Sequence, residues 1–187
     1  MNGSYENKID TMHFEKVTNL HKGTILSWFN ETHVKKHYYG KGLQNTLQNI
    51  ELYCQGINNN GHYSFDHWIA FYDETPLAFL MSSPLVNSKN LDNGKWYMEG
   101  RKTFTLDLLI GPKEFLGKGL SYRMIQKFIL DKFSYADYFI IDPAKDNQKA
   151  IHVYEKAGFK EVGEFFPSFD PTKRHVMMRM AVKDLKR

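Results

Sequence analysis

The feature that most constrains this chain is a strand-like segment that runs through a glycine-containing loop into an amphipathic helix. The segment covers residues 104–123, FTLDLLIGPKEFLGKGLSYR, and apolar residues recur beyond it at helical spacing. Gly117 and Gly119 let the loop backbone approach a ligand closely, and N–H groups at the helix start favour a pyrophosphate. Walker A is excluded because GK[ST] is absent, and the Rossmann glycine pattern fails at Tyr122.

A second strand-to-helix unit follows. The run YFII predicts a strand, and DPAKDNQKAIHVYEKAGF continues from it over residues 142–159. Asn147 is predicted as the N-cap of the helix and Gly158 as its C-cap. The order strand, helix, strand, helix therefore predicts a mixed α/β sheet with helices packed on it.

The remaining elements are predicted from periodicity and turn residues. A hairpin is expected over residues 67–83 with its turn at Glu74-Thr75, followed by a surface loop at 85–95. Strands are also expected at 13–17, 102–111, 159–165 and 174–182, and helices at 21–29 and about 43–54.

Composition narrows the class of protein. The 187 residues with 42% hydrophobic content predict a single domain, 1–187, whose first dozen residues or so are frayed. No apolar run is long enough to cross a membrane, and the opening residues lack a signal core, so a cytoplasmic location is expected. Basic and acidic residues are interspersed, so nucleic acid is not an expected partner despite the net charge of +4. Cys54 stands alone and the histidines lack metal-ligand spacing, so we expect no metal.

The two C-terminal motifs carry a family resemblance. LGKGLS and N-x-x-A-x-x-x-Y-E-K-A-G-F together resemble the acetyl-CoA motifs of the GCN5-related N-acetyltransferase (GNAT) superfamily. The resemblance is closest to the aminoglycoside 6'-N-acetyltransferases and the related siderophore acyltransferases. An upstream segment, SWFNETHVKKHYYG, is similar to the opening of the same subgroup at Trp28, His33, Val34 and Tyr38.

The resemblance implies the GNAT fold, a mostly antiparallel sheet splayed at the acetyl-CoA site with helices on both faces. It implies that the pantetheine arm meets the strand that holds Asp107 and that the pyrophosphate meets the LGKGLS turn. We expect Lys118, Lys149 and Lys156 to contribute at most electrostatic steering of the cofactor phosphates. The expected acetyl-CoA contacts are Leu108, Ile110, Leu116, Gly117, Lys118, Gly119, Leu120, Ser121, Asn147, Ala150, Tyr154 and Lys156.

The resemblance also assigns catalytic roles. Asp107 is expected to accept a proton from the amine, and Tyr154 to protonate the departing thiolate. From periodicity alone, Asp107 would face solvent and Tyr154 would be a core aromatic; Glu99 is an alternative base. The acceptor is expected to meet Trp28, Trp96, Glu99, Asp107, Asp142 and Asp170.

Together these expectations predict an enzyme that transfers an acetyl group from acetyl-CoA to a primary amine of a small molecule, foremost an aminoglycoside 6'-amine. The amine is expected to attack the thioester directly in a ternary complex. One alternative is acylation of a hydroxylated lysine in siderophore assembly. Another is a non-catalytic acyl-CoA-binding module, which would not need Asp107 or Tyr154 for its role. The sequence leaves a monomer and a homodimer equally open.

Overall fold

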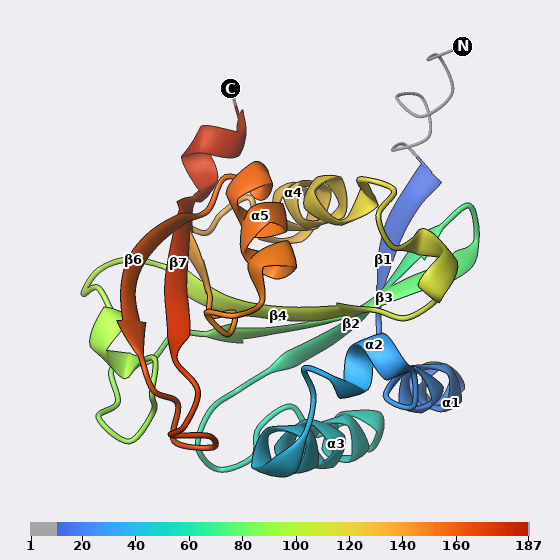
Figure 1. Cartoon of the computed structure of the whole chain (residues 1–187), viewed down its shortest axis with the longest axis horizontal. Helices are drawn as coiled ribbons and strands as arrows, with labels where there is room; N and C mark the ends of the chain where they lie inside the picture. Colours follow the sequence, from blue (N-terminus) through green and yellow to red (C-terminus); the bar gives the residue numbers. More distant parts are fainter. Residues whose placement is uncertain (1–10, 187) are drawn as a thin grey trace. The chain divides into compact units, whose positions relative to one another are not determined.

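The computed structural model describes residues 11–186, which form an α/β structure with the strands in one sheet (Figure 1). The strand order is β1-β2-β3-β4-β5-β7-β6. The strands are β1 (Met12–Lys16), β2 (Asp66–Tyr72), β3 (Thr75–Pro84), β4 (Thr103–Ile110), β5 (Tyr138–Ile141), β6 (Lys160–Phe165) and β7 (His175–Ala181). The α-helices are α1 (Asn19–Trp28), α2 (Thr32–Lys35), α3 (Gly40–Cys54), α4 (Leu120–Phe133) and α5 (Gln148–Ala157).

Two compact units share these elements. The first comprises the chain up to Met81 together with Leu108–Met124, and the second comprises Ser82–Asp107 together with the chain from Ile125 onward. Each unit has buried apolar residues of its own. The expectation of one domain over residues 1–187 stays a prediction, and the expected frayed end lies largely outside the described residues.

The first unit is built on an antiparallel pairing of β1 with β2, in which Met12 lies opposite Tyr72 and Lys16 opposite Trp68. Helices α1 and α3 contribute Ile25 and Ile50, which are fully buried in one apolar cluster with Ile69 and other residues. Burial of this apolar area is the main stabilising contribution.

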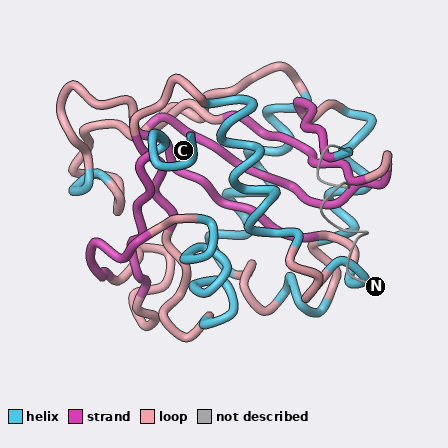
Figure 2. Tube along the Cα trace, turned by 90° about the horizontal axis from the view of Figure 1, so that it is seen from above, coloured by secondary structure: helices cyan, strands magenta, loops and turns pink. Residues whose placement is uncertain are grey.

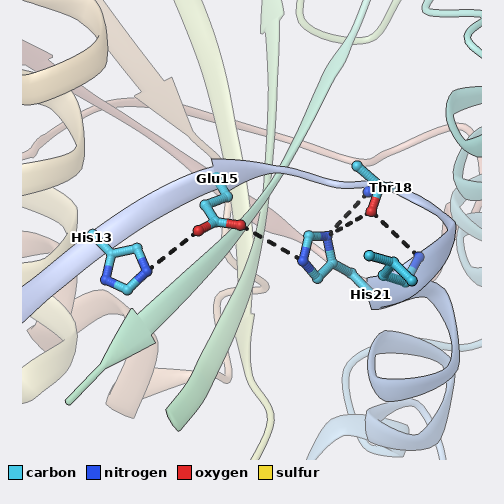
Figure 3. A network of polar contacts seen from close by, with 5 residues as sticks. His13, Glu15, Thr18 and His21 are labelled. Carbon is cyan, nitrogen blue, oxygen red and sulfur yellow. Dashed lines mark hydrogen bonds and ion pairs between the residues drawn. The ribbon is translucent and has the colours of Figure 1, made fainter. Parts of the chain in front are cut away.

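A hydrogen-bonded cap starts α1, as Figure 3 shows. The Thr18 hydroxyl accepts from the Leu20 N–H at 3.3 Å, and the His21 Nδ1 accepts from the Thr18 N–H at 3.1 Å. Because Nδ1 accepts, the proton of the neutral ring lies on Nε2, which is 3.8 Å from Glu15. His13 approaches the other oxygen of Glu15 at 3.5 Å, so the cap is tied to β1.

The second unit combines parallel and antiparallel pairing. β4 pairs in parallel with β5, whereas β7 pairs antiparallel with both β5 and β6. β7 therefore lies between β5 and β6, although β6 precedes it in the chain. Helices α4 and α5 lie side by side in this unit, where the Gln126 amide donates to the Ala157 carbonyl at 3.2 Å.

β4 separates from β5 near the middle of its length. The parallel register pairs Thr103, Phe104 and Thr105 with residues 138–140 and extends no further, although β4 continues to Ile110. Backbone groups beyond the paired segment thus face an edge that β5 does not cover. A strand edge of this kind can accept an extended ligand.

The structure confirms most predicted elements, and it corrects three details. The predicted turn at Glu74-Thr75 is wrong by one residue: Asp73 and Glu74 both have positive φ, at 46° and 61°, and Thr75 already belongs to β3. Helix α2 was not predicted, because four residues are too few to show a helical period. The predicted 85–95 loop is shorter than expected, because its last two residues already belong to the 3₁₀ turn Gly94–Trp96; Figure 2 draws loops in pink and helices in cyan.

His67 gives the first unit a pH-dependent stability. The side chain is 1% exposed among the rings of Tyr53, Phe65 and Phe79, and its Nδ1 has no hydrogen-bond partner. Burial, more than any nearby charge, lowers the pKa of His67 from 6.5 to about 4. The unfolded chain therefore binds the proton more readily, and stability is lost as the pH falls from 6.5 toward 4.

We expect the wild-type protein to lose about 2 kcal/mol of folding free energy through His67 alone between pH 7.5 and pH 5. His67→Leu should lack this component while retaining the acid sensitivity of the other groups. Urea unfolding of both proteins at the two pH values measures the difference. Equal losses in the two proteins would contradict the assignment.

Candidate active site

The glycine loop before α4 has a backbone that only glycine adopts readily. Gly117 and Gly119 have φ values of 73° and 70°, in the left-handed region. Both residues are exposed, as is Lys118 between them, whereas Leu120 is buried at the first turn of α4 and Ser121 is half-buried. The loop thus presents bare backbone next to a helix N-terminus, and this fits a pyrophosphate. Leu116 is 40% exposed at the entrance to this loop.

Two side chains of the first unit, both from the SWFNETHVKKHYYG segment, form hydrogen bonds with the part of β4 that continues beyond its pairing with β5. The His33 Nε2 donates to the Ile110 carbonyl at 2.9 Å, and the Tyr38 hydroxyl donates to the Leu108 carbonyl at 3.1 Å. The Gly111 N–H bonds to Leu77 of β3, and since backbone groups alternate along a strand, these carbonyls point to the other edge. His33 and Tyr38 therefore hold the edge at which a pantetheine arm was predicted.

Trp28 has a packing role that the sequence did not reveal. Its ring is 6% exposed and belongs to the apolar core of the first unit. A Cβ placed on Gly111 would lie 2.1 Å from the indole ring, so Trp28 packs directly on the β4 backbone. The expectation that Trp28 flanks a sugar ring is not supported, because almost no ring surface remains for a ligand.

Helix α5 carries the second motif, and both of its predicted caps are confirmed. The Asn147 side chain accepts from the Ala150 N–H at 3.3 Å, and Gly158 adopts φ 111° at the C-cap. Ala150 is half-buried and Lys156 is exposed. The N-cap role is compatible with the expected contact between Asn147 and acetyl-CoA, and that contact stays a prediction.

Tyr154 lies on the buried face of α5, 8% exposed and beside Phe159. Burial raises the pKa of the Tyr154 phenol, and the negative charges of Asp107 and Asp142 raise it further. The phenol therefore keeps its proton until a stronger base arrives. A general acid must hold its proton at the working pH, and the Tyr154 phenol meets that condition.

The two candidate bases both lie in the second unit. Asp107 is exposed on β4, although Leu106 and Leu109, which lie on opposite faces of the strand, are both buried. Its charge nevertheless reaches Tyr154 and His175. Glu99 is also exposed, on the turn before β4, and its charge is not among those that act on Tyr154. Asp107 is therefore better placed than Glu99.

His175, the partner of Asp142, was not among the residues predicted from the sequence. The His175 Nδ1 donates to the Asp142 backbone carbonyl at 2.7 Å and lies 3.1 Å from its carboxylate. Burial alone would lower the pKa of His175, but the hydrogen bond and charge of Asp142, together with the charge of Asp107, raise it overall. Within the string HVMMRM a lone histidine is typical of a core residue, so its only signal was its position at the start of a predicted strand.

The other predicted acceptor residues lie on two loops that are joined. Asp170 accepts from the Thr172 N–H and hydroxyl, at 3.2 and 2.5 Å, which fixes its carboxylate in the loop before β7. Trp96 packs against Phe165 at 5.0 Å between ring centroids, with the Lys95 ammonium 4.1 Å from its ring. Asp92, near Trp96, accepts from both the N–H and the hydroxyl of Ser168.

Neither a metal centre nor a membrane span is evident in residues 11–186. No group of three or more His, Cys, Asp or Glu side chains there is arranged to hold a metal ion. No helix in the same part of the chain has the length and apolar content needed to cross a bilayer.

Comparisons with known proteins agree with this geometry. Residues 18–166 match the family described as Acetyltransferase (GNAT) domain. An aminoglycoside N(6')-acetyltransferase from Legionella pneumophila has a similar crystal structure, with a TM-score of 0.81, 33% identity, and coverage of 94% of this chain and 95% of that one. An aminoglycoside N(6')-acetyltransferase type 1 from Serratia marcescens is 25% identical over 97% of this chain and 90% of its own length. A structure of AAC(6')-Ib in complex with ribostamycin and coenzyme A has the same fold, with a TM-score of 0.77, 22% identity, and coverage of 95% and 97%.

The glycine loop can be tested against a matched position. Gly117→Ala forces a side chain into a left-handed conformation, at a cost of about 1 kcal/mol. Gly100 has the same φ of 73° and similarly open surroundings but lies outside the loop, so Gly100→Ala imposes the same strain elsewhere. We expect both variants to be similarly destabilised and only Gly117→Ala to raise the KM for acetyl-CoA, by about fivefold or more.

Thermal unfolding and steady-state kinetics measure the two effects. An equal rise in the KM for acetyl-CoA in the two variants would attribute the defect to general strain and contradict the role of the loop.

Proposed function

The chain belongs to the GNAT family of acetyl-CoA-dependent N-acetyltransferases, and from that premise we propose that it acetylates the 6'-amine of an aminoglycoside. The relatives named as aminoglycoside N(6')-acetyltransferases support this acceptor class, as they match nearly the whole chain. The observation that carries the proposal is that one unit holds two solvent-accessible carboxylates, Asp107 and Asp142, together with the buried phenol of Tyr154. Such a group suits a polycationic acceptor and offers both a base and an acid.

Acetyl-CoA supplies an activated acetyl group as a thioester. The residues present fit it: the exposed Gly117–Gly119 backbone can receive the pyrophosphate, and the β4 edge beyond Thr105 can receive the pantetheine arm. His33 and Tyr38 hold that edge through the carbonyls of Ile110 and Leu108. Ordering of the arm along a fixed edge would place the thioester without further rearrangement of the strand.

Asp107 prepares the amine. An aliphatic amine has a pKa near about 10 and is mostly protonated at neutral pH, so it cannot attack a carbonyl until it loses a proton. The exposed Asp107 carboxylate attracts the ammonium ion and accepts its proton, directly or through water. Asp142, 39% exposed by side chain, adds a second negative charge that holds the polycation.

Tyr154 completes the proton balance. When the neutral amine attacks the thioester carbonyl, the C–N bond forms, the nitrogen passes its second proton to solvent, and the C–S bond breaks, so the leaving thiolate needs a proton at neutral pH. The Tyr154 phenol is buried in this unit and protonated at neutral pH, so it can serve as the donor. It can give its proton to the thiolate and regain one from solvent.

The two alternatives drawn from the sequence have less support. Acylation of a hydroxylated lysine finds no counterpart among the similar proteins described above, which are named for aminoglycoside acetylation. A non-catalytic acyl-CoA-binding module would need neither the buried Tyr154 phenol nor the carboxylates of Asp107 and Asp142.

The proposal is tested by CoA release in a panel of aminoglycosides, polyamines, hydroxylated lysine and peptides. We expect turnover with kanamycin-type acceptors, and Asp107→Asn should lower kcat by about a hundredfold or more because the base is lost. Asp73→Asn is the matched control, since Asp73 lies in the β2–β3 turn at positive φ, which asparagine tolerates. Turnover of another amine class in preference to every aminoglycoside would overturn the acceptor assignment.

Tyr154→Phe separates the acid from the packing role. The phenyl ring preserves the contact with Phe159, so we expect an unchanged melting temperature and an unchanged KM for acetyl-CoA. The kcat should fall about tenfold to a hundredfold, because the thiolate must then take its proton from water. An unaltered kcat would show that Tyr154 is only a core aromatic.

A further inference from the structure

The second unit places an imidazole against one of the two carboxylates of the proposed acceptor site. We propose that His175 is a positioning residue for the acceptor: it fixes Asp142 through Nδ1 and sets the net charge that the acceptor amine meets. The inference rests on the proposed function and adds the group that controls how strongly the site attracts cations.

The contacts of Nδ1 determine the tautomer. Nδ1 lies 2.7 Å from the Asp142 carbonyl oxygen and 3.1 Å from its carboxylate, and both oxygens can only accept. The proton of neutral His175 therefore lies on Nδ1, and the second proton is gained at Nε2. The hydrogen bond to Asp142 is present in both charge states, whereas the total charge of the pair changes from −1 to 0 on protonation.

The backbone holds the two residues in register. The Val176 N–H donates to the Pro143 carbonyl at 3.0 Å, and the Lys145 N–H donates to the Arg174 carbonyl at 2.8 Å. These bonds lie on either side of His175, which forms a β-bridge with Ala144. The turn that carries Asp142 is thus attached to β7, and a change at His175 would act on the Asp142 carboxylate more than on the chain path.

Aromatic rings cover the imidazole on its other sides. Phe165 of β6 and Phe169 of the following loop contact it edge-on, at 5.8 and 5.7 Å between centroids. The His175 side chain is 11% exposed, so its charge is weakly screened by water. A change in the charge of the His175 ring therefore changes the electrostatic potential at the Asp142 carboxylate.

The other charged groups around the ring are accounted for by their own partners. Glu164 of β6 pairs with Lys145 and with Arg174, the latter at 3.1 Å. Asp170, beside Phe169, is held by Thr172. Asp107 of β4 is the second carboxylate whose charge acts on the imidazole, and it favours the protonated ring.

The charge of the pair predicts how acceptor binding depends on pH. The pKa of His175 lies above its ordinary value of 6.5, because the hydrogen bond and charge of Asp142 outweigh the opposing effect of burial. As the pH falls through this pKa, the pair loses its negative charge and attracts a polycation less. The KM for the acceptor should then rise, while the KM for acetyl-CoA should not.

Two substitutions separate the hydrogen bond from the charge. His175→Asn keeps an N–H donor near the position of Nδ1 and does not titrate, whereas His175→Phe keeps a ring between Phe165 and Phe169 but removes the donor. We measure the KM for kanamycin at pH 8 and at pH 6. As the pH falls, this KM should rise by a factor roughly three times larger in the wild-type enzyme than in His175→Asn. His175→Phe should raise the acceptor KM about tenfold over wild type at pH 8 and by less at pH 6, because phenylalanine does not titrate. His152→Asn, an exposed histidine of α5, is the matched control and should follow the wild type.

An NMR titration of the His175 ring gives a readout that does not depend on turnover. Asp142→Asn should lower the titration midpoint of His175, assigned by its absence in His175→Asn. An unchanged midpoint would overturn the inference, as would identical profiles of acceptor KM against pH in wild type and His175→Asn. A lowered midpoint together with no turnover of any aminoglycoside would sustain the coupling of His175 to Asp142 and reject the proposed acceptor.

Discussion

The separation of β4 from β5 after three paired residues is the constraint on which the candidate site depends. A strand that leaves its neighbour exposes backbone donors and acceptors, and these are costly unless they find partners. Here the chain satisfies two of them, the carbonyls of Leu108 and Ile110, with the side chains of Tyr38 and His33. These two hydrogen bonds fix the position of the strand end, and Trp28 packs on Gly111 next to it.

The second unit contains a buried phenol, that of Tyr154, which stays protonated at neutral pH. Tyr154 is buried on α5, and two carboxylates from separate elements, β4 and the turn after β5, act on it. Asp142 in turn is bound by His175, which belongs to a third element. These side chains are therefore placed by strands β4 and β7, by the turn after β5 and by helix α5, and not by any single loop.

Most of the fold could be predicted from the sequence because its elements carry local signals. The caps at Asn147 and Gly158, the apolar period of α4 and the strand YFII each depend on neighbouring residues alone. The placement of β7 between β5 and β6 could not be predicted, since it depends on long-range pairing. The candidate site was predicted by motif, yet the packing of Trp28 and the partner of Asp142 were not. The residue type alone does not show whether a tryptophan or a histidine belongs to the core or to a ligand site. Only tertiary contacts distinguish these two roles.

The link between Asp92 and Ser168 bears on the entropy of acceptor binding. Asp92 belongs to the segment between β3 and β4, and Ser168 to the segment between β6 and β7, so two hydrogen bonds at 2.7 and 2.9 Å join loops that are far apart in the chain. Two loops joined in this way lose part of their conformational freedom before any ligand arrives. A ligand that contacts either loop therefore binds to a segment that is already partly ordered. Less conformational entropy is then lost when the ligand binds.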